Sequence, residues 1–364
     1  MSIEQQLPGK TLNPGNPYKF IGLEQHEQPS DSLFVIQVRC DTSETAHPLQ
    51  AIGTTAIDQR GTVYYGDPYK KILPTGSTIN LIPATTQIHE LLINDQNHLL
   101  EQHLLQEDVT VVASLGGPDI GPQLIEQVTQ QTKESHTTAQ YGGIYPHKDL
   151  IDYTVLQMAE DLQHNPEYII NGINQRFFIY TICRGTELQL LKLTGKPPQT
   201  LDHLLDDGIK VEDHRRLLSD GTSDINGIRH HVKPVEGTEE LLEEIQFPPE
   251  VFTDPKGGVV SNHHEGYLLS TLDTQKLAQQ GWYPIAVAPD GVVEILIKLG
   301  QDHWTNKTLV LGIAMQNHPE KSDTPTDKKL REWMYQQMIL HAAWVQSYSE
   351  YINETVSNDL LSAD

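Results

Sequence analysis

Residues 181–185, Thr-Ile-Cys-Arg-Gly, have the types and the order that a cysteine nucleophile needs. The apolar run 177–183 predicts a buried strand, and residues 185–193 predict a helix that begins directly after it. A sharp turn between the two would lift the Cys183 side chain out of the sheet. At a helix N-terminus the dipole and the N–H groups stabilise a thiolate, and the N–H of Arg184 would face a developing oxyanion. The pattern is compatible with a catalytic Cys183, but taken alone it is more typical of a small core residue, which free cysteines usually are.

A histidine and a glutamate follow another apolar run, at residues 316–320 (Gln-Asn-His-Pro-Glu). The preceding run, 309–315, predicts a strand, and the sites of open α/β sheets lie at the carboxyl ends of strands. His318 could serve there as a general base, while Glu320 could accept the other ring N–H and fix the tautomer. The alternative is a surface turn.

Two glycines and an aspartate follow a third apolar run, 109–115, as Gly-Gly-Pro-Asp at residues 116–119. Glycines let the backbone approach a substrate closely, and their N–H groups can serve as oxyanion donors. Taken alone, the motif is more typical of a plain turn.

Histidines occur as two adjacent pairs, His230–His231 and His263–His264. Adjacent histidines seldom point at one ion, and no spaced acidic or cysteine partner completes a ligand set in the sequence. We therefore expect structural or pocket-lining histidines, no metal site and no cofactor. Cys40, at the end of an early apolar run, is expected to be an inert core thiol.

Strand and helix patterns alternate along the chain. Strands are predicted near 33–40, 78–82, 109–115, 177–183, 231–235, 258–260, 283–288, 292–299 and 309–315, and helices near 88–106, 123–133, 150–163, 185–193 and 327–353. This alternation favours an α/β fold with a mostly parallel sheet covered on both faces. We expect one domain over residues 33–353, with an irregular lead-in at 1–32, a loop-rich excursion at about 195–260 and a tail at 354–364.

The charge of the chain excludes some classes of partner. Its 364 residues include 25 Lys and Arg against 49 Asp and Glu, a net charge of −24, so we expect no nucleic-acid partner. The longest membrane-like run, Leu309–Met315, falls far short of the ~20 apolar residues of a span. No secretory signal is visible and there are only two cysteines, which predicts a cytoplasmic protein.

Taken in order, the three motifs resemble those of the class I glutamine amidotransferase-like superfamily, and within it the peptidase C26 branch that includes γ-glutamyl hydrolases. That branch has G-G-x-D after an early strand, G-x-C-x-G at the nucleophile and H-P-E near the end, which correspond to Gly116–Asp119, Cys183–Gly185 and His318–Glu320. Further segments of the branch are similar to residues 231–241 (HVKPVEGTEEL), 259–266 (VVSNHHEG) and 281–294 (GWYPIAVAPDGVVE). The resemblance covers roughly residues 33–350.

The resemblance implies the flavodoxin-like three-layer α/β/α sandwich of the superfamily. It implies Cys183 as the nucleophile, His318 as the general base and Glu320 as the residue that orients it. The N–H groups of Gly117 and Arg184 would form the oxyanion hole. The expected reaction is hydrolysis of a small-molecule γ-glutamyl amide through a glutamyl thioester.

Substrate contacts are expected at Gly116, Asp119, Glu187, His263, His264 and Glu265. The last three, with the excursion at 195–260, are expected to select the group beyond the scissile amide, and the acidity of that excursion favours a cationic leaving group. Three residues depart from the family pattern: Thr181 stands in place of glycine, Asn317 in place of a common tryptophan, and Glu265 in place of glutamine.

Two other functions remain open on the sequence. One is a glutaminase subunit that delivers ammonia to a separate synthase. The other is a non-catalytic binding or regulatory protein on the same scaffold. The sequence does not predict an oligomeric state.

Overall fold

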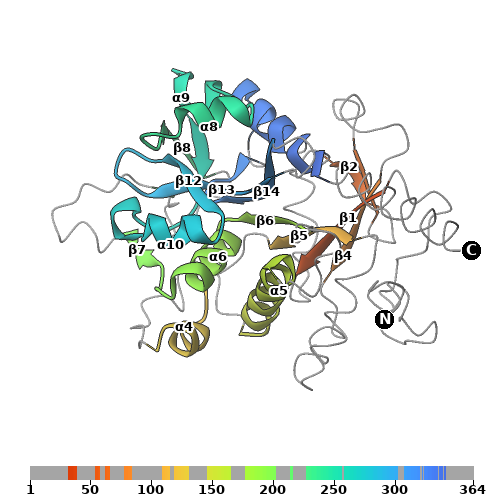
Figure 1. The fold of residues 1–364 in the computed structure, drawn as a ribbon, viewed down its shortest axis with the longest axis vertical. Coiled ribbons are helices and arrows are strands. Elements are labelled where there is room, and N and C mark those ends of the chain that lie inside the picture. Colours follow the sequence, from red (N-terminus) through yellow and green to blue (C-terminus); the bar gives the residue numbers. More distant parts are fainter. Residues whose placement is uncertain are drawn as a thin grey trace, which may run out of the picture.

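Short apolar runs form the strands of one sheet, as the sequence predicts. Figure 1 draws a computed structural model of the chain, in which helices lie on both sides of this sheet. The structure describes residues 32–38, 54–57, 62–65, 78–83, 109–114, 119–130, 146–164, 177–201, 214–215, 227–255, 258–301, 307–319, 322, 324–334, 336–338 and 340–341.

Ten strands make up the main sheet in this part of the chain, and two separate two-stranded sheets lie outside it. The order in the main sheet is β2 (Thr54–Ile57), β3 (Thr62–Tyr65), β4 (Thr78–Pro83), β1 (Ser32–Val38), β5 (Val109–Ser114), β6 (Phe178–Ile182), β14 (Thr308–Met315), β13 (Val293–Gln301), β12 (Trp282–Val287) and β9 (Lys233–Pro234).

The centre of the sheet is parallel and its two sides are antiparallel. Strands β4, β1, β5, β6 and β14 run parallel to one another, whereas all other neighbouring pairs in this sheet are antiparallel. The sheet is therefore mixed, and the prediction of a mostly parallel sheet is wrong. The reason lies in the short connections: only residues 288–292 join β12 to β13, whereas a parallel crossover needs about a dozen residues or more.

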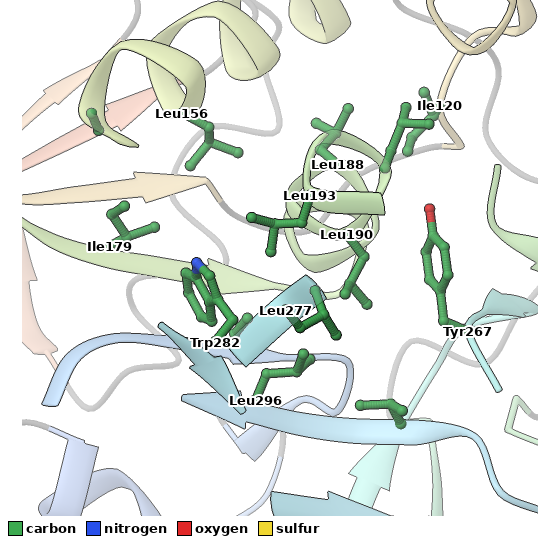
Figure 2. Close-up of a cluster of buried hydrophobic side chains, with 14 of the residues drawn as sticks. Ile120, Leu156, Ile179, Leu188, Leu190, Leu193, Tyr267, Leu277, Trp282 and Leu296 are labelled. Atoms are coloured by element: carbon green, nitrogen blue, oxygen red, sulfur yellow. The ribbon is translucent and has the colours of Figure 1, made fainter. Parts of the chain in front are cut away.

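One face of the sheet packs on helices α4 (Pro122–Thr129), α5 (Pro146–His164), α6 (Arg184–Thr194) and α10 (Thr274–Gln279). Figure 2 shows the centre of this cluster, where Ile179 and Trp282 of the sheet lie opposite Leu188 and Leu277 of the helices. These side chains are at most 1% exposed, so this face supplies one full apolar core.

The opposite face packs on α8 (Glu239–Glu244), α9 (Glu250–Thr253) and the helical residues 325–334 and 336–338. Phe178, Tyr180 and Ile182 of β6 belong to this second cluster, while Ile179 belongs to the first. Successive strand residues point to opposite faces, so a strand that is apolar throughout is buried on both. The continuous apolar run at 177–183 is explained in this way.

The predicted helices at 123–133, 150–163 and 185–193 correspond to α4, α5 and α6. The predicted helix at 88–106 lies outside the described residues, as do the tail at 354–364 and residues 1–31 of the lead-in predicted at 1–32. Of the helix predicted at 327–353, the part up to 341 is helical where it is described. The excursion predicted at 195–260 contains short elements, namely β7 (Gln199–Thr200), β8 (Ile228–His230), β9, α8, α9 and the start of β10 (Val259–Ser261).

Candidate active site

Cys183 lies at the turn between β6 and α6, where the sequence predicts it. Its backbone has φ 52° and ψ −116°, a conformation that residues with a Cβ rarely adopt. The Cys183 N–H donates to the Met315 carbonyl at 2.6 Å, and its own carbonyl accepts from the N–H groups of Thr186 and Glu187. Backbone strain of this kind clusters at active sites, because only a rigid surrounding maintains it. The strand, the turn at Cys183 and the helix follow one another in the order found in a nucleophile elbow.

The residues around the turn explain how it packs. A Cβ on Gly185 would lie 2.1 Å from the carbonyl oxygen of Ser114 on β5, so only glycine allows this approach. Thr181, which departs from the family pattern, is fully buried, with its Oγ1 3.1 Å from that of Thr186. The Thr186 hydroxyl in turn donates to the Met315 carbonyl at 2.8 Å. The extra hydroxyl at position 181 is thus accommodated by a polar partner.

His318 follows the strand next to that of Cys183. Strands β6 and β14 are parallel neighbours with Ile182 opposite Met315, so the carboxyl ends of the two strands lie side by side at the same edge of the sheet. The His318 N–H donates to the Val260 carbonyl at 2.6 Å, and the residue is buried. Topology therefore brings the predicted nucleophile and base to adjacent strand ends.

Four predicted residues lie outside the described residues: Gly116 and Gly117 of the oxyanion motif, Glu320 as the orienting residue, and Cys40. Their roles remain predictions.

The Arg184 side chain forms a buried ion pair with Asp152. Its Nη1 donates to Oδ2 of Asp152 on α5 at 2.6 Å, and the Ser114 hydroxyl donates to the same oxygen at 3.1 Å. Both members of this ion pair are buried. Arg184 therefore joins α6 to α5 through its side chain, and only its backbone N–H can take the predicted oxyanion role.

Two predicted substrate contacts, Glu187 and Glu265, are linked through Gln316, which directly follows β14. Gln316 donates through Nε2 to Glu187 Oε1 at 2.8 Å and to the backbone carbonyl of Glu265 at 3.4 Å. The Tyr267 pKa is raised well above its ordinary value, first by burial and then by the charges of Glu187 and Glu265. His264 Nε2 lies 3.3 Å from Oδ2 of Asp119, so these two predicted contacts pair with each other.

A buried polar cluster surrounds Glu294 on β13, and we call it the His–Glu294 cluster. Oε1 of Glu294 lies 3.0 Å from His214 Nδ1, 3.3 Å from His230 Nε2 and 3.2 Å from His263 Nε2. The other nitrogen of His214, Nε2, lies 2.9 Å from Oδ2 of Asp290. Adjacent histidines do diverge, since His230 is buried and His231 exposed.

Sequence reasoning missed this cluster because the acidic partner comes from a distant strand. The available signal was Glu294 itself, a carboxylate inside the apolar run 292–297. A charge that is buried in a strand needs partners. His214, in a polar segment, gave no comparable signal.

The cluster shifts the pKa values of its members in different directions. Burial lowers the pKa of His214, but hydrogen bonds and charge from Asp290 and Glu294 outweigh burial and raise it to about 9. For His263, burial prevails over the attraction of Glu294 and lowers the pKa to about 4. The pKa of Glu294 is held well below its ordinary value although burial opposes this, because His230, His263 and His214 stabilise the carboxylate.

Comparisons with known proteins do not assign this chain to a group: no family model matches it, and no curated protein matches it. Among the helices that the structure describes, none is both long and apolar enough to cross a membrane.

Proposed function

We propose that this chain is a cysteine-dependent hydrolase of γ-glutamyl amide bonds, of the class I glutamine amidotransferase-like type that its motifs resemble. The observation that carries the proposal is the backbone of Cys183, at φ 52° and ψ −116° between β6 and α6. An inert core cysteine has no need of a strained conformation, whereas a nucleophile at a strand-to-helix turn does.

We also propose that the fold is the flavodoxin-like three-layer sandwich of that superfamily. Support comes from the order of the five parallel strands β4, β1, β5, β6 and β14. Numbered along the chain among themselves, they run 2-1-3-4-5, which is the flavodoxin-like order. The two apolar clusters, one on each face, are the packing that such a sandwich requires. Strands β12 and β13 would be an antiparallel extension beside β14.

In the proposed reaction the Cys183 sulfur attacks the γ-carbonyl carbon of the substrate, and His318 takes the thiol proton. The tetrahedral oxyanion would accept hydrogen bonds from the Arg184 N–H, the first of helix α6, and from that of Gly117. The C–N bond then breaks, and His318 returns the proton to the leaving amine. Water, deprotonated by His318, hydrolyses the glutamyl thioester and restores the Cys183 thiol.

The acidic groups near the site fit the amino acid end of such a substrate. Glu187 and Glu265 both act electrostatically on Tyr267, and Gln316 joins Glu187 to the Glu265 backbone. We propose that these carboxylates, with Asp119, attract the α-ammonium group of the glutamyl moiety. His264, which pairs with Asp119, would contact the group beyond the scissile amide.

A mass-spectrometric trapping experiment tests the proposal. The protein is incubated with a panel of γ-glutamyl amines, γ-glutamyl peptides and glutamine, and is quenched in acid. We expect a glutamyl adduct on the peptide that contains Cys183, together with free glutamate. Cys40→Ala is the matched control and should behave like the wild type, while Cys183→Ala should form neither adduct nor glutamate.

The same experiment separates the alternatives. Ammonia release from glutamine alone would point to a glutaminase subunit. Absence of adduct and of hydrolysis over the whole panel, in protein that is folded by circular dichroism, would contradict the proposed function and favour a binding protein.

A further inference from the structure

We propose that the His–Glu294 cluster binds one divalent transition-metal ion, with Zn²⁺ the expected ion, through His214, His230, His263 and Glu294 in a closed structural site. This inference does not depend on the proposed hydrolase activity, because none of the four ligands is assigned a chemical step.

Three of the four inner atoms are spaced closely enough to share one metal ion. His214, His230 and Glu294 each offer a ligand atom, and these three atoms all lie within 4.8 Å of one another. The nitrogens of the three histidines lie 3.0–3.3 Å from Glu294 Oε1. Neighbouring ligands of a tetrahedral zinc ion, with bonds of about 2.0–2.2 Å, are separated by roughly 3.3 Å. His263 does not belong to that set of three, so its Nε2, 3.2 Å from Glu294 Oε1, has to move toward the ion to complete a four-ligand site.

The outer nitrogens are held as they are in metal-binding histidines. His230 Nδ1 lies 3.0 Å from the His231 carbonyl, and His263 Nδ1 lies 2.9 Å from the Glu265 carbonyl. His214 Nε2 faces the Asp290 carboxylate at 2.9 Å. A ligating histidine almost always donates its outer N–H to a carbonyl or a carboxylate, which fixes the tautomer and aims the other nitrogen at the ion. All three histidines meet this condition.

The same hydrogen bonds decide which nitrogen of each ring can bind a cation. A carbonyl oxygen only accepts, so Nδ1 of His230 and of His263 carries a proton. The other nitrogen of each ring, Nε2, is then the atom that faces Glu294, and Nε2 is a nitrogen through which imidazole binds metal ions. The hydroxyl of Ser261, 2.7 Å from His230 Nε2, is the alternative hydrogen-bonding partner of that nitrogen.

The chemistry of the donors selects the ion. Three imidazoles and a carboxylate suit zinc and related transition metals, whereas Ca²⁺ and Mg²⁺ prefer oxygen ligands alone. The side chains of His214 and Glu294 are 0% exposed, that of His263 is 1% and that of His230 is 5%. A site with four protein ligands and no access to solvent has no open position for a substrate, which is typical of structural zinc. The ion would connect residue 214 to three other segments: β8, which carries His230; the residues that follow β10, which include His263; and β13, which carries Glu294.

Metal titration of the untagged full-length chain tests this inference. Bound metal is first removed with a chelator under native conditions, and Zn²⁺ or Co²⁺ is then added back. We expect elemental analysis to find about one added ion bound per chain. The Co²⁺ form should show the visible absorption of a tetrahedral ion, without a thiolate charge-transfer band. X-ray absorption at the zinc edge should show nitrogen and oxygen neighbours only, at about 2.0–2.1 Å.

Variants assign the site. Glu294→Gln and His230→Ala should lose stoichiometric binding, while His231→Ala, which removes the exposed neighbour of His230, should retain it. Asp290→Asn should weaken binding by about 10–100-fold, as loss of an outer-shell carboxylate does. Cys183→Ala should bind as the wild type does, which separates this site from the proposed nucleophile.

Three results would overturn the inference. They are a wild-type chain that is folded yet binds no Zn²⁺ or Co²⁺ stoichiometrically, sulfur in the coordination sphere, and undiminished binding in Glu294→Gln. In the first case protons, with Ser261, would be the groups that hold the cluster together. Because the wild-type measurements need no variant, the test remains decisive even if a ligand variant fails to fold.

Discussion

At the scale of single residues, the conformation of Cys183 distinguishes it from an ordinary core thiol. The side chain is 8% exposed, and its backbone is fixed on one side by Met315 and on the other by the first turn of α6. A thiolate at this position benefits from the helix dipole. Its reactivity is therefore predicted to exceed that of the other cysteine.

We predict that iodoacetamide at neutral pH labels Cys183 before Cys40. The measurement is peptide mass spectrometry after limited alkylation, with denatured protein as the control in which both cysteines react alike. Preferential labelling of Cys40 in the folded protein would contradict the assignment of the nucleophile.

The proposed role of His318 as general base is tested by its substitution. His318→Ala should lower turnover of any substrate that Cys183 cleaves by about 10²–10⁴-fold, the usual contribution of a general acid–base group. Glu320→Ala should cost less, since an orienting residue contributes less than the base that it positions. The control is His231→Ala, which removes an exposed histidine. Turnover at the wild-type rate in His318→Ala would exclude this residue as the base.

At the scale of elements, the elbow depends on how closely α6 approaches β5. Gly185, the second residue of α6, lies against the Ser114 carbonyl, and Ser114 also contacts Asp152, the partner of Arg184. One strand end, one helix start and one buried ion pair therefore share the same contact region. A change in any of them is expected to move the Cys183 turn.

Gly185→Ala should destabilise the fold by about 3 kcal/mol, at the upper end of overpacking costs, because the new Cβ meets backbone that cannot rotate away. The matched control is Gly195→Ala at the end of α6, where φ is 68° and no atom lies within 4 Å of the added Cβ. It should cost only about 1–2 kcal/mol, for the left-handed backbone. Urea denaturation of both variants measures the difference, and equal losses would show that the Ser114 contact is not limiting.

At the scale of the whole molecule, one buried carboxylate joins the helix layer to the sheet. Glu160 on α5 accepts from Gln189 Nε2 of α6 at 2.7 Å and from Trp282 Nε1 of β12 at 2.8 Å. It also pairs with Lys298 of β13, whose pKa is lowered by burial although the charge of Glu160 opposes this. Four elements are thus connected through a single side chain.

Glu160→Ala should therefore lower the free energy of unfolding by about 3–5 kcal/mol, since it leaves the Lys298 ammonium buried without its carboxylate. The control, Asp161→Ala, removes the exposed neighbouring carboxylate and should change stability by about 0.5 kcal/mol or less. Adding Lys298→Met to Glu160→Ala should recover part of the loss. If the double variant were as unstable as the sum of the two single changes, the ion pair would not be the source of the effect.

The sequence by itself determined the central elements of the described part of the chain, although β2, β3, α8, α9 and α10 were not predicted from it. The apolar runs at 109–115, 177–183 and 309–315 became β5, β6 and β14, and the segments predicted as helices at 123–133, 150–163 and 185–193 became α4, α5 and α6. The position of Cys183 between a strand and a helix was also predictable. These features are local, because the order of apolar and polar residues along a short segment indicates whether it forms a strand or a helix.

Only the tertiary structure decided which distant residues meet. Short connections at 288–292 and 302–307 turned β12, β13 and β14 into an antiparallel group, so the sheet is mixed rather than mostly parallel. The pairing of β13 with β14 joins the N–H of Gln316 to the carbonyl of Glu294, and the fold brings His214, His230 and His263 to the Glu294 carboxylate. Contacts between segments that are tens of residues apart depend on strand order and register, and no local pattern in the sequence specifies either.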